Sequence, residues 1–190
     1  MVLKTRDRLI EVARKLFLLK GIENTTMLDI ANASDNGRRT VYSYFKNKGD
    51  IYSAVIERES ENYVKSVRLI AESDEEPNVK LTNFIIERFN TLKEAAKQKE
   101  SILSWLKIDF NKTEKIKKAV FAKEEDIINS IINEGINSGD FDPERTYALP
   151  HMLPTMIRAI WNQTNENPDD DTDKIESSFV AFVINGLKKH

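Results

Sequence analysis

Two adjacent arginines, Arg38 and Arg39, begin a short polar segment whose residue types suit the binding of another molecule. The planar guanidinium group donates parallel hydrogen bonds that match the two acceptors, O6 and N7, on the major-groove edge of guanine. Thr40 can bond a base edge or place its methyl on thymine, while Tyr42 and Ser43 can reach bases or phosphates. These types predict a helix that reads DNA. The alternative is that the arginines are solvated first-turn cations and that Tyr42 belongs to a core.

The elements that would position these residues are two short helices around a tight turn. Thr26, with Asp29 three residues later, has the spacing of a capping box and predicts the start of a helix of about two turns. Residues 35–37 are Asp, Asn and Gly. The first two bond their own backbone and the glycine allows a positive φ, so we expect a turn there. In the helix that follows, Val41 and Phe45 are four residues apart and can both face inward.

Charge is distributed unevenly along the chain of 190 residues, whose formal net charge is −2. The first fifty residues contain ten Lys or Arg against six Asp or Glu, and the remainder contains nineteen against twenty-five. Clustered cations favour phosphate binding through the release of counterions, so a basic N-terminal part on an acidic body predicts localised contact with DNA. Ordinary scatter of charge is the alternative.

Apolar residues recur at helical spacing along almost the whole chain, and this predicts an all-α protein. Leu9, Ala13 and Phe17 lie on one stripe of the first helix, and Gly21 suits its C-terminal cap. Similar reasoning predicts about nine helices. The first contains the stripe from Leu9 to Phe17, the others begin near residues 27, 38, 48, 77, 102, 113, 143 and 173, and the fourth runs from 48 to about 71.

Several functional classes have no support in the residues. The chain has no cysteine, so a disulfide framework and a thiolate metal site are excluded. Motifs for nucleotide loops, zinc proteases and serine hydrolases are missing, so we expect neither an enzyme nor a cofactor nor a metal. The N-terminal segment lacks an apolar signal region, and no stretch approaches about 18 apolar residues. We therefore expect a cytoplasmic protein that makes no membrane contact.

The N-terminal part combines a fixed set of residues in one register, namely Phe17, Gly21, Thr25, Thr26, Asp29, Ile30, Ala31, Thr40, Tyr42, Phe45 and Lys48. In these residues it resembles the TetR family of bacterial transcriptional regulators. This resemblance implies a three-helix helix-turn-helix domain over residues 1–47, joined by a long helix to a helical ligand-binding and dimerisation domain over 48–190. It also implies a ligand-responsive repressor that binds a palindromic double-stranded operator as a homodimer, although activation stays open.

The chain departs from the family at the turn, where Ala-Gly-Val-Ser is usual and residues 34–37 read Ser-Asp-Asn-Gly. The usual serine cap is lost, so the start of the recognition helix is open between a cap at Gly37 and one at Asn36. Arg39 also replaces a small residue. These departures leave room for a rival class, a helical interaction or ligand-sequestering protein that does not bind DNA.

Phosphate contacts are assigned partly by this resemblance. Tyr44, Lys46 and Lys48 are expected to follow the DNA backbone. Thr25 and Thr26 are expected to meet phosphate at a helix N-terminus, where free N–H groups and the helix dipole favour anions. The alternative for the threonines is a simple capping role.

The sequence after residue 47 predicts two further surfaces. The last helix is apolar over more of its circumference than one core contact needs, which favours a dimer interface; burial within one chain is the alternative. Its residues are Ile175, Phe179, Phe182, Val183 and Leu187. Large apolar side chains elsewhere suit a pocket for a small apolar or amphipathic ligand, or plain core. They are Phe84, Phe89, Trp105, Phe110, Phe121, Met152, Met156 and Trp161. Pro150 and Pro154 are both expected inside the penultimate helix, where they would bend it.

Overall fold

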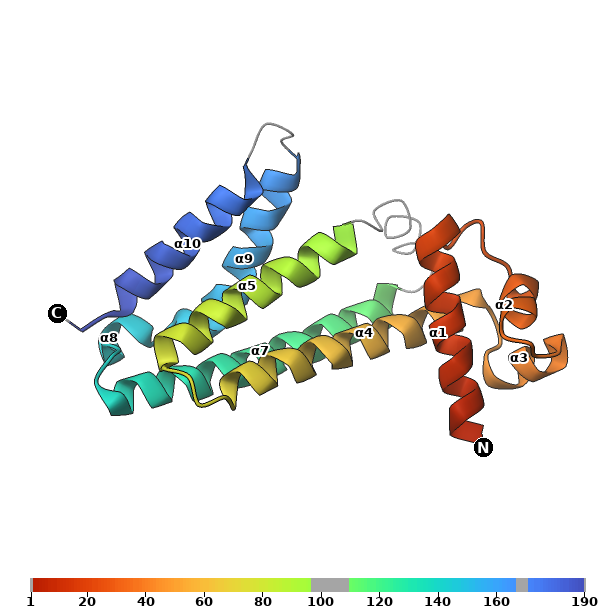
Figure 1. Cartoon of the computed structure of the whole chain (residues 1–190), viewed down its shortest axis with the longest axis horizontal. Coiled ribbons are helices and arrows are strands. Elements are labelled where there is room, and N and C mark those ends of the chain that lie inside the picture. Colours follow the sequence, from red (N-terminus) through yellow and green to blue (C-terminus); the bar gives the residue numbers. More distant parts are fainter. Residues whose placement is uncertain (1, 97–109, 167–170, 190) are drawn as a thin grey trace. The chain divides into compact units, whose positions relative to one another are not determined.

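The computed structural model describes residues 2–96, 110–166 and 171–189, and every regular element in these ranges is an α-helix (Figure 1). This confirms the predicted all-α class. The nine helices of the described residues are α1 (Val2–Lys20), α2 (Met27–Ala33), α3 (Arg38–Tyr44), α4 (Lys48–Ala71), α5 (Pro77–Ala96), α7 (Phe110–Ser138), α8 (Pro143–Thr146), α9 (Leu149–Glu166) and α10 (Thr172–Leu187). None of these helices combines the length and apolar character that crossing a bilayer requires.

Most helix ends follow the local signals, and α4 has the predicted bounds. The single helix predicted to begin near residue 143 is two helices in the structure, since α8 ends at Thr146 and α9 begins at Leu149. Pro150 therefore lies in the first turn of α9, where its missing N–H has no helical partner to lose, and the expectation that it bends the helix is wrong. Pro154 is inside α9 as predicted. The short helix expected near residue 102 lies outside the described residues.

The chain forms two compact units, and the division falls within α4. The first unit comprises Met1–Glu61 and Ala95–Lys117, and the second comprises Asn62–Glu94 and Lys118–His190. These units are defined by packing, so the functional boundary expected before Lys48 stays a prediction.

The first unit has its own apolar core beneath α1, α2, α3 and the start of α4. The predicted stripe of α1 is confirmed, since Leu9, Ala13 and Phe17 are buried. Gly21 ends α1 with φ +79°, as its capping role requires. Opposing side chains complete this core, namely Ile10, Ile22, Ile30, Ala31, Val41, Phe45, Ile51, Tyr52, Ala54 and Val55.

The second unit buries one face each of α4, α5, α7, α9 and α10. Its fully buried side chains include Phe84, Leu81, Ile85, Phe89, Ile128, Ile131, Leu153 and Ile157. Gly135 of α7 is buried under the ring of Phe141, where a Cβ would lie 2.2 Å from Cδ2. Glycine at 135 therefore allows the chain to turn back over the end of α7.

Candidate nucleic-acid interface

The N-terminus of α2 has the predicted cap. Thr26 accepts a hydrogen bond from the Asp29 backbone N–H at 3.1 Å, and Asp29 Oδ2 accepts one from the Thr26 N–H at 2.7 Å. The Lys20 ammonium lies 2.8 Å from the same carboxylate. This ammonium and the Thr26 donors lower the pKa of Asp29 to about 2. The capping box is confirmed, and it fixes the start of α2 from local residues alone.

The turn between α2 and α3 has its left-handed residue at an unexpected position. Asp35 has φ +52°, whereas Gly37 has φ −66°. The predicted turn is present, but the freedom of Gly37 to take a positive φ is not used, and Asp35, a residue type that tolerates this conformation, adopts it instead. Asn36 donates its side-chain amide to the Ser34 carbonyl at 2.8 Å. This bond supports the turn from within.

The start of the recognition helix is settled by the backbone. Gly37 is the N-cap of α3 and makes no side-chain bond, while its carbonyl accepts the N–H groups of Thr40 and Val41. The helix therefore begins at Arg38. Glycine is a weaker cap than the usual serine, but it still permits the extended conformation that a cap adopts.

The two faces of α3 differ sharply. Val41 is fully buried and its C-cap Phe45 is 4% exposed, so both anchor the helix on the core as predicted. Arg38 and Arg39 are exposed, and no carboxylate in the described ranges pairs with either. Tyr42 is 45% exposed, and its ring centroid lies 6.0 Å from the Arg38 guanidinium carbon. The solvent face of α3 thus carries unpaired hydrogen-bond donors next to an aromatic ring.

The remaining polar residues of α3 have mixed positions. Ser43 is exposed and donates its hydroxyl to the Thr40 carbonyl at 2.7 Å, while Thr40 is half-buried. Tyr44 is half-buried against the core of the first unit, so much of its ring is unavailable to a DNA backbone. Lys46 is exposed. Ser43 and Lys46 therefore remain open to a ligand.

Two predicted phosphate contacts are corrected. Thr25 is fully buried and donates its hydroxyl to the Gly21 carbonyl at 2.7 Å, so its side chain cannot meet a phosphate. Lys48 donates its ammonium to the Ile22 and Glu23 carbonyls at 2.6 and 3.2 Å. Its main contact is therefore with the chain between α1 and α2 and not with solvent.

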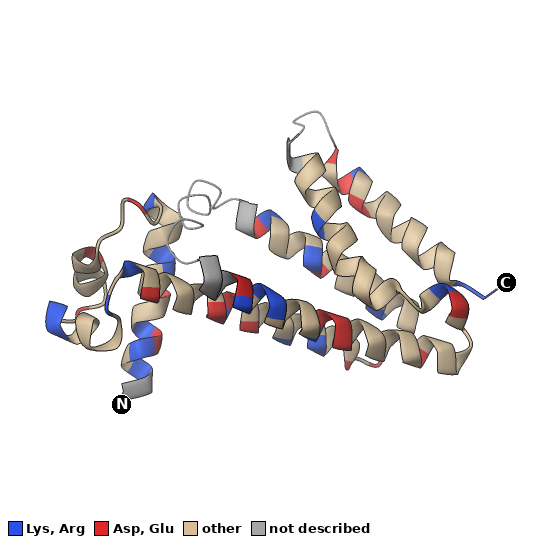
Figure 2. Ribbon diagram, turned by 180° about the vertical axis from the view of Figure 1, so that it is seen from behind, with Lys and Arg blue, Asp and Glu red and all other residues tan. Residues whose placement is uncertain are grey.

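The first helix contributes charged groups that the sequence reasoning did not place. Arg14 Nε lies 2.7 Å from Glu59 Oε1, and Arg58 pairs with Asp7, so two ion pairs join α1 to α4 within the first unit. Arg8 pairs with a residue of the α2–α3 turn. Figure 2 shows Lys and Arg along α1 and at the start of α3. In the sequence, the only indication of these ion pairs was the series of basic residues at the beginning of the chain. Their partners are remote in sequence, so the pairing itself could not be predicted.

The predicted pocket residues are dispersed in the second unit. Phe84 and Phe89 are buried in its core. Met156 and Trp161 are half-buried against that core, whereas Met152 is 49% exposed. The Phe121 ring lies 5.6 Å from that of His151. Trp105 and the Phe110 side chain lie outside the described residues.

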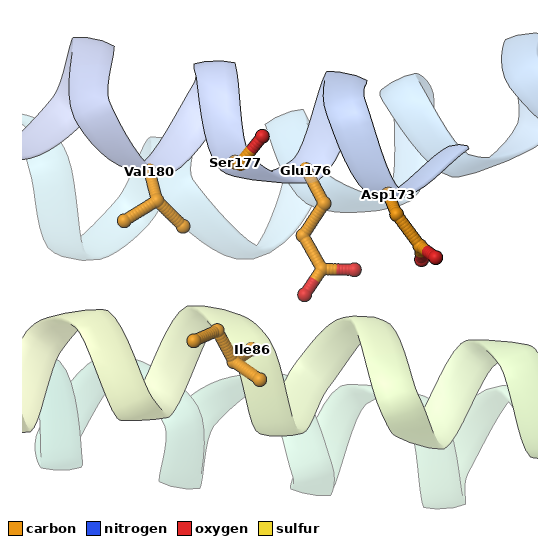
Figure 3. Close-up of a pocket in the computed structure, with 5 residues that line it drawn as sticks. All are labelled: Ile86, Asp173, Glu176, Ser177 and Val180. Carbon is orange, nitrogen blue, oxygen red and sulfur yellow. The ribbon is translucent and has the colours of Figure 1, made fainter. Parts of the chain in front are cut away.

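A cavity with a volume of about 320 Å³ lies between α5 and α10 (Figure 3). It is lined by Ile86, Asp173, Glu176, Ser177 and Val180, none of which was predicted. The Lys93 ammonium lies 2.8 Å from a carboxylate oxygen of both acids, and these contacts raise the pKa of Lys93. The acidic side of this cavity is thus already neutralised in part by the chain itself.

A buried polar cluster joins α4, α5 and α7. Tyr63 donates its hydroxyl to Glu124 Oε1 at 2.5 Å, and Arg88 Nε lies 2.9 Å from the same oxygen in an ion pair. The Glu124 side chain is 1% exposed. Burial raises its pKa, while the Arg88 charge and the Tyr63 hydroxyl oppose that rise. Burial and the Glu124 charge also raise the pKa of Tyr63.

The predicted dimer stripe on α10 divides into two faces. Phe179, Val183 and Leu187 are buried in the core of their own unit, so they have little surface left for a partner. This outcome is the alternative considered from the sequence. Ile175 is half-buried, and Phe182 is 70% exposed. The interface prediction therefore rests on Phe182 and its exposed neighbours Ser178, Ala181, Asn185 and Gly186.

Comparison with known proteins agrees with this architecture. The family model for bacterial regulatory proteins of the tetR family matches residues 9–55, which contain α2, α3 and parts of α1 and α4. The HTH-type transcriptional regulator YhgD of Bacillus subtilis is 24% identical over 194 residues, covering 98% of each chain.

Solved structures share the fold at lower identity. A transcriptional regulator from Cytophaga hutchinsonii has a TM-score of 0.81 and 21% identity, covering 95% of this chain and 97% of that one. SmeT of Stenotrophomonas maltophilia, in its complex with triclosan, has a TM-score of 0.70 and 14% identity, covering 98% and 92%. The match to the family model identifies residues 9–55 as a DNA-binding helix-turn-helix of the tetR family type, and along nearly its whole length this chain is similar to a helix-turn-helix transcriptional regulator.

Proposed function

We propose that the protein is a repressor that reads a palindromic operator with α3. The supporting observation is the pair Arg38 and Arg39 in the exposed first turn of α3, unpaired by any carboxylate in the described part of the chain. Val41 and Phe45 hold the opposite side of the helix in the core. A rigidly held helix that presents two unsatisfied guanidinium groups fits the dimensions and the acceptors of a major groove.

The polar residues in and around α3 would contact different parts of the DNA. Arg38 and Arg39 would each donate two hydrogen bonds to a guanine, and Tyr42 and Ser43 would contact neighbouring bases or phosphates. Lys46 and Tyr44 would lie along the DNA backbone, the latter with a reduced surface. Thr26 would place the N-terminus of α2 near a phosphate, where its cap leaves other N–H groups free.

The test begins with selection of bound sequences from a random DNA pool. A palindromic consensus is expected, since two-fold dimers bind half-sites about 34 to 36 Å apart. The double variant Arg38→Ala with Arg39→Ala should then bind the selected operator far more weakly. Two bidentate contacts in each half-site, at roughly 1 to 3 kcal/mol each, correspond to a loss of about 30-fold to more than 10,000-fold per bound subunit.

The matched control removes charge from an exposed site outside the reading head, the name used here for the helix-turn-helix of α2 and α3 with α1. Lys65→Ala with Arg68→Ala, both exposed on α4 in the second unit, should leave operator affinity unchanged. Circular dichroism should show equal melting for both double variants and the parent. Unchanged operator affinity in the α3 variant, or no consensus from the pool, would contradict the proposal and favour a protein that does not bind DNA.

The homodimer and the ligand response are further parts of this proposal. The exposed face of α10 around Phe182 would pair with its counterpart in a second copy, which is how two reading heads would reach both half-sites. A small apolar or amphipathic molecule bound in the second unit would favour a conformation with low operator affinity, and it can do so only through a difference in affinity between the two states. The solved SmeT–triclosan complex supports this part. The site of action would be the cytoplasm, where the operator lies.

A further inference from the structure

The first two turns of α1 contact both ends of the recognition helix. The Arg6 guanidinium carbon lies 5.5 Å from the ring centroid of Phe45, the C-cap of α3. Arg8 Nη2 lies 2.9 Å from Oδ2 of Asp35, two residues before the N-cap of α3. All four residues belong to the first unit, so these contacts are internal to one packed body. Two arginines on α1 thus flank α3, one near its end and one near its beginning.

Both arginines retain the means to bind an anion. Arg8 and Asp35 side chains are 57% and 84% exposed, so their ion pair is solvated and easily exchanged. Arg6 continues the buried stripe of Ile10 and Ala13, yet it is only half-buried. Its guanidinium face rests on an aromatic ring, which leaves the N–H edges available to acceptors. Within the described ranges, no carboxylate pairs with Arg6.

The positions favour phosphate over bases. An α-helix with its side chains is about 10 to 12 Å across, and it fills a major groove about 12 Å wide. Since α3 has only seven residues, it is about as long as it is wide, and groups packed around it lie close to the sugar–phosphate strands that border the groove. We propose that Arg6 and Arg8, with the exposed Lys4 one turn earlier, bind DNA phosphates beside the half-site read by α3. This inference rests on the proposed DNA-binding function and extends its contact surface to α1.

Asp35 has a defined part in this arrangement. Its carboxylate holds Arg8 beside α3 in the free protein, but it also places a negative charge where phosphate must approach. Arg8 therefore exchanges one anion for another on binding, which reduces the net gain. Asp35→Asn keeps a residue type that tolerates a positive φ and removes the competing charge. This variant should bind every DNA sequence more tightly than the parent does.

The experiment measures affinity for the selected operator and for unrelated DNA of equal length between 50 and 200 mM salt. Each lost phosphate contact should reduce the slope of log affinity against log salt by about 0.9 per bound subunit. Over this fourfold range, the loss of affinity on adding salt should be smaller by about 3.5-fold per subunit. Arg6→Gln and Arg8→Gln should show this change on both DNAs and leave their affinity ratio unaltered.

The control is Lys15→Gln, which removes an exposed cation from the same helix about two turns farther on. It should not change the slope. Arg8→Gln and Lys4→Gln carry the test even if Arg6→Gln melts early, since Arg8 and Lys4 are exposed. Unaltered slopes in these two variants, with operator binding still lost when Arg38 and Arg39 are replaced, would overturn this inference alone. Failure of the parent to bind any DNA would overturn the proposed function.

Discussion

Replacing Tyr63 by phenylalanine tests whether the buried polar cluster stabilises the second unit. The change deletes one hydroxyl and keeps the ring, which lies 5.1 Å from the Arg88 guanidinium carbon. The lost bond is a 2.5 Å contact to Glu124, whose side chain is 1% exposed. A hydrogen bond to a charged group contributes about 1.5 to 3 kcal/mol, and Glu124 would keep only its ion pair with Arg88 in a buried place where water cannot replace the lost hydroxyl.

The expected loss in the free energy of unfolding is therefore about 1.5 to 3 kcal/mol for Tyr63→Phe. For a chain of this size it corresponds to a fall in Tm of about 3 to 12 °C. Urea denaturation at a fixed protein concentration would measure it, since self-association shifts apparent stability. Tyr147→Phe is the matched control, because Tyr147 is 89% exposed and should change nothing.

The pH dependence gives the sharper check. The pKa of Glu124 is raised on folding, mainly by burial, so this group costs stability as pH rises from its ordinary pKa through the raised one. The Tyr63 hydroxyl opposes that rise, so its removal raises the pKa of Glu124 further. The difference between parent and variant should be complete above that pKa and shrink on acidification as Glu124 becomes neutral. A loss below about 0.5 kcal/mol, or one independent of pH, would refute the reasoning.

Two other substitutions have defined outcomes. Gly135→Ala should gain about 1 kcal/mol of helix propensity but force a Cβ to within 2.2 Å of the Phe141 ring, so urea unfolding should show a net loss of about 1 to 2 kcal/mol. The control is Asn133→Ala, an exposed position of the same helix, which should be mildly stabilising. Equal stability changes in the two variants would show that the Phe141 ring moves freely. Phe182→Ser should raise the dimer dissociation constant at least about tenfold in sedimentation experiments without lowering the secondary-structure content, and an unchanged constant would exclude this face as the interface.

Local features of the fold were predictable because they depend on residues close in sequence. The capping box of Thr26 and Asp29, the inward pair Val41 and Phe45, and the bounds of α4 all follow from spacing and cap chemistry. The start of α3 at Arg38 was also within reach, since glycine is an acceptable cap. These features needed no knowledge of which helices pack together.

The features that were missed depend on partners remote in sequence. Thr25 has the same residue type as its neighbour, and only the packing of α1 over it decides that it is buried. The carbonyls that bind Lys48 lie 25 and 26 residues earlier in the chain. The apolar stripe of α10 was correct as a pattern, but periodicity cannot say whether a stripe faces its own core or a second copy.

The position of the Lys48 ammonium changes how the charge of the reading head should be counted. Its contacts with the Ile22 and Glu23 carbonyls, and the pairing of Lys20 with Asp29, engage two of the ten cations in the first fifty residues with groups of the chain itself. These cations join the ends of helices and are a poor guide to affinity for polyanions. The electrostatic attraction of this head for DNA is consequently a matter of a few side chains on one side of α3 and α1. A total charge computed from composition would overestimate how strongly heparin or bulk nucleic acid retains the protein.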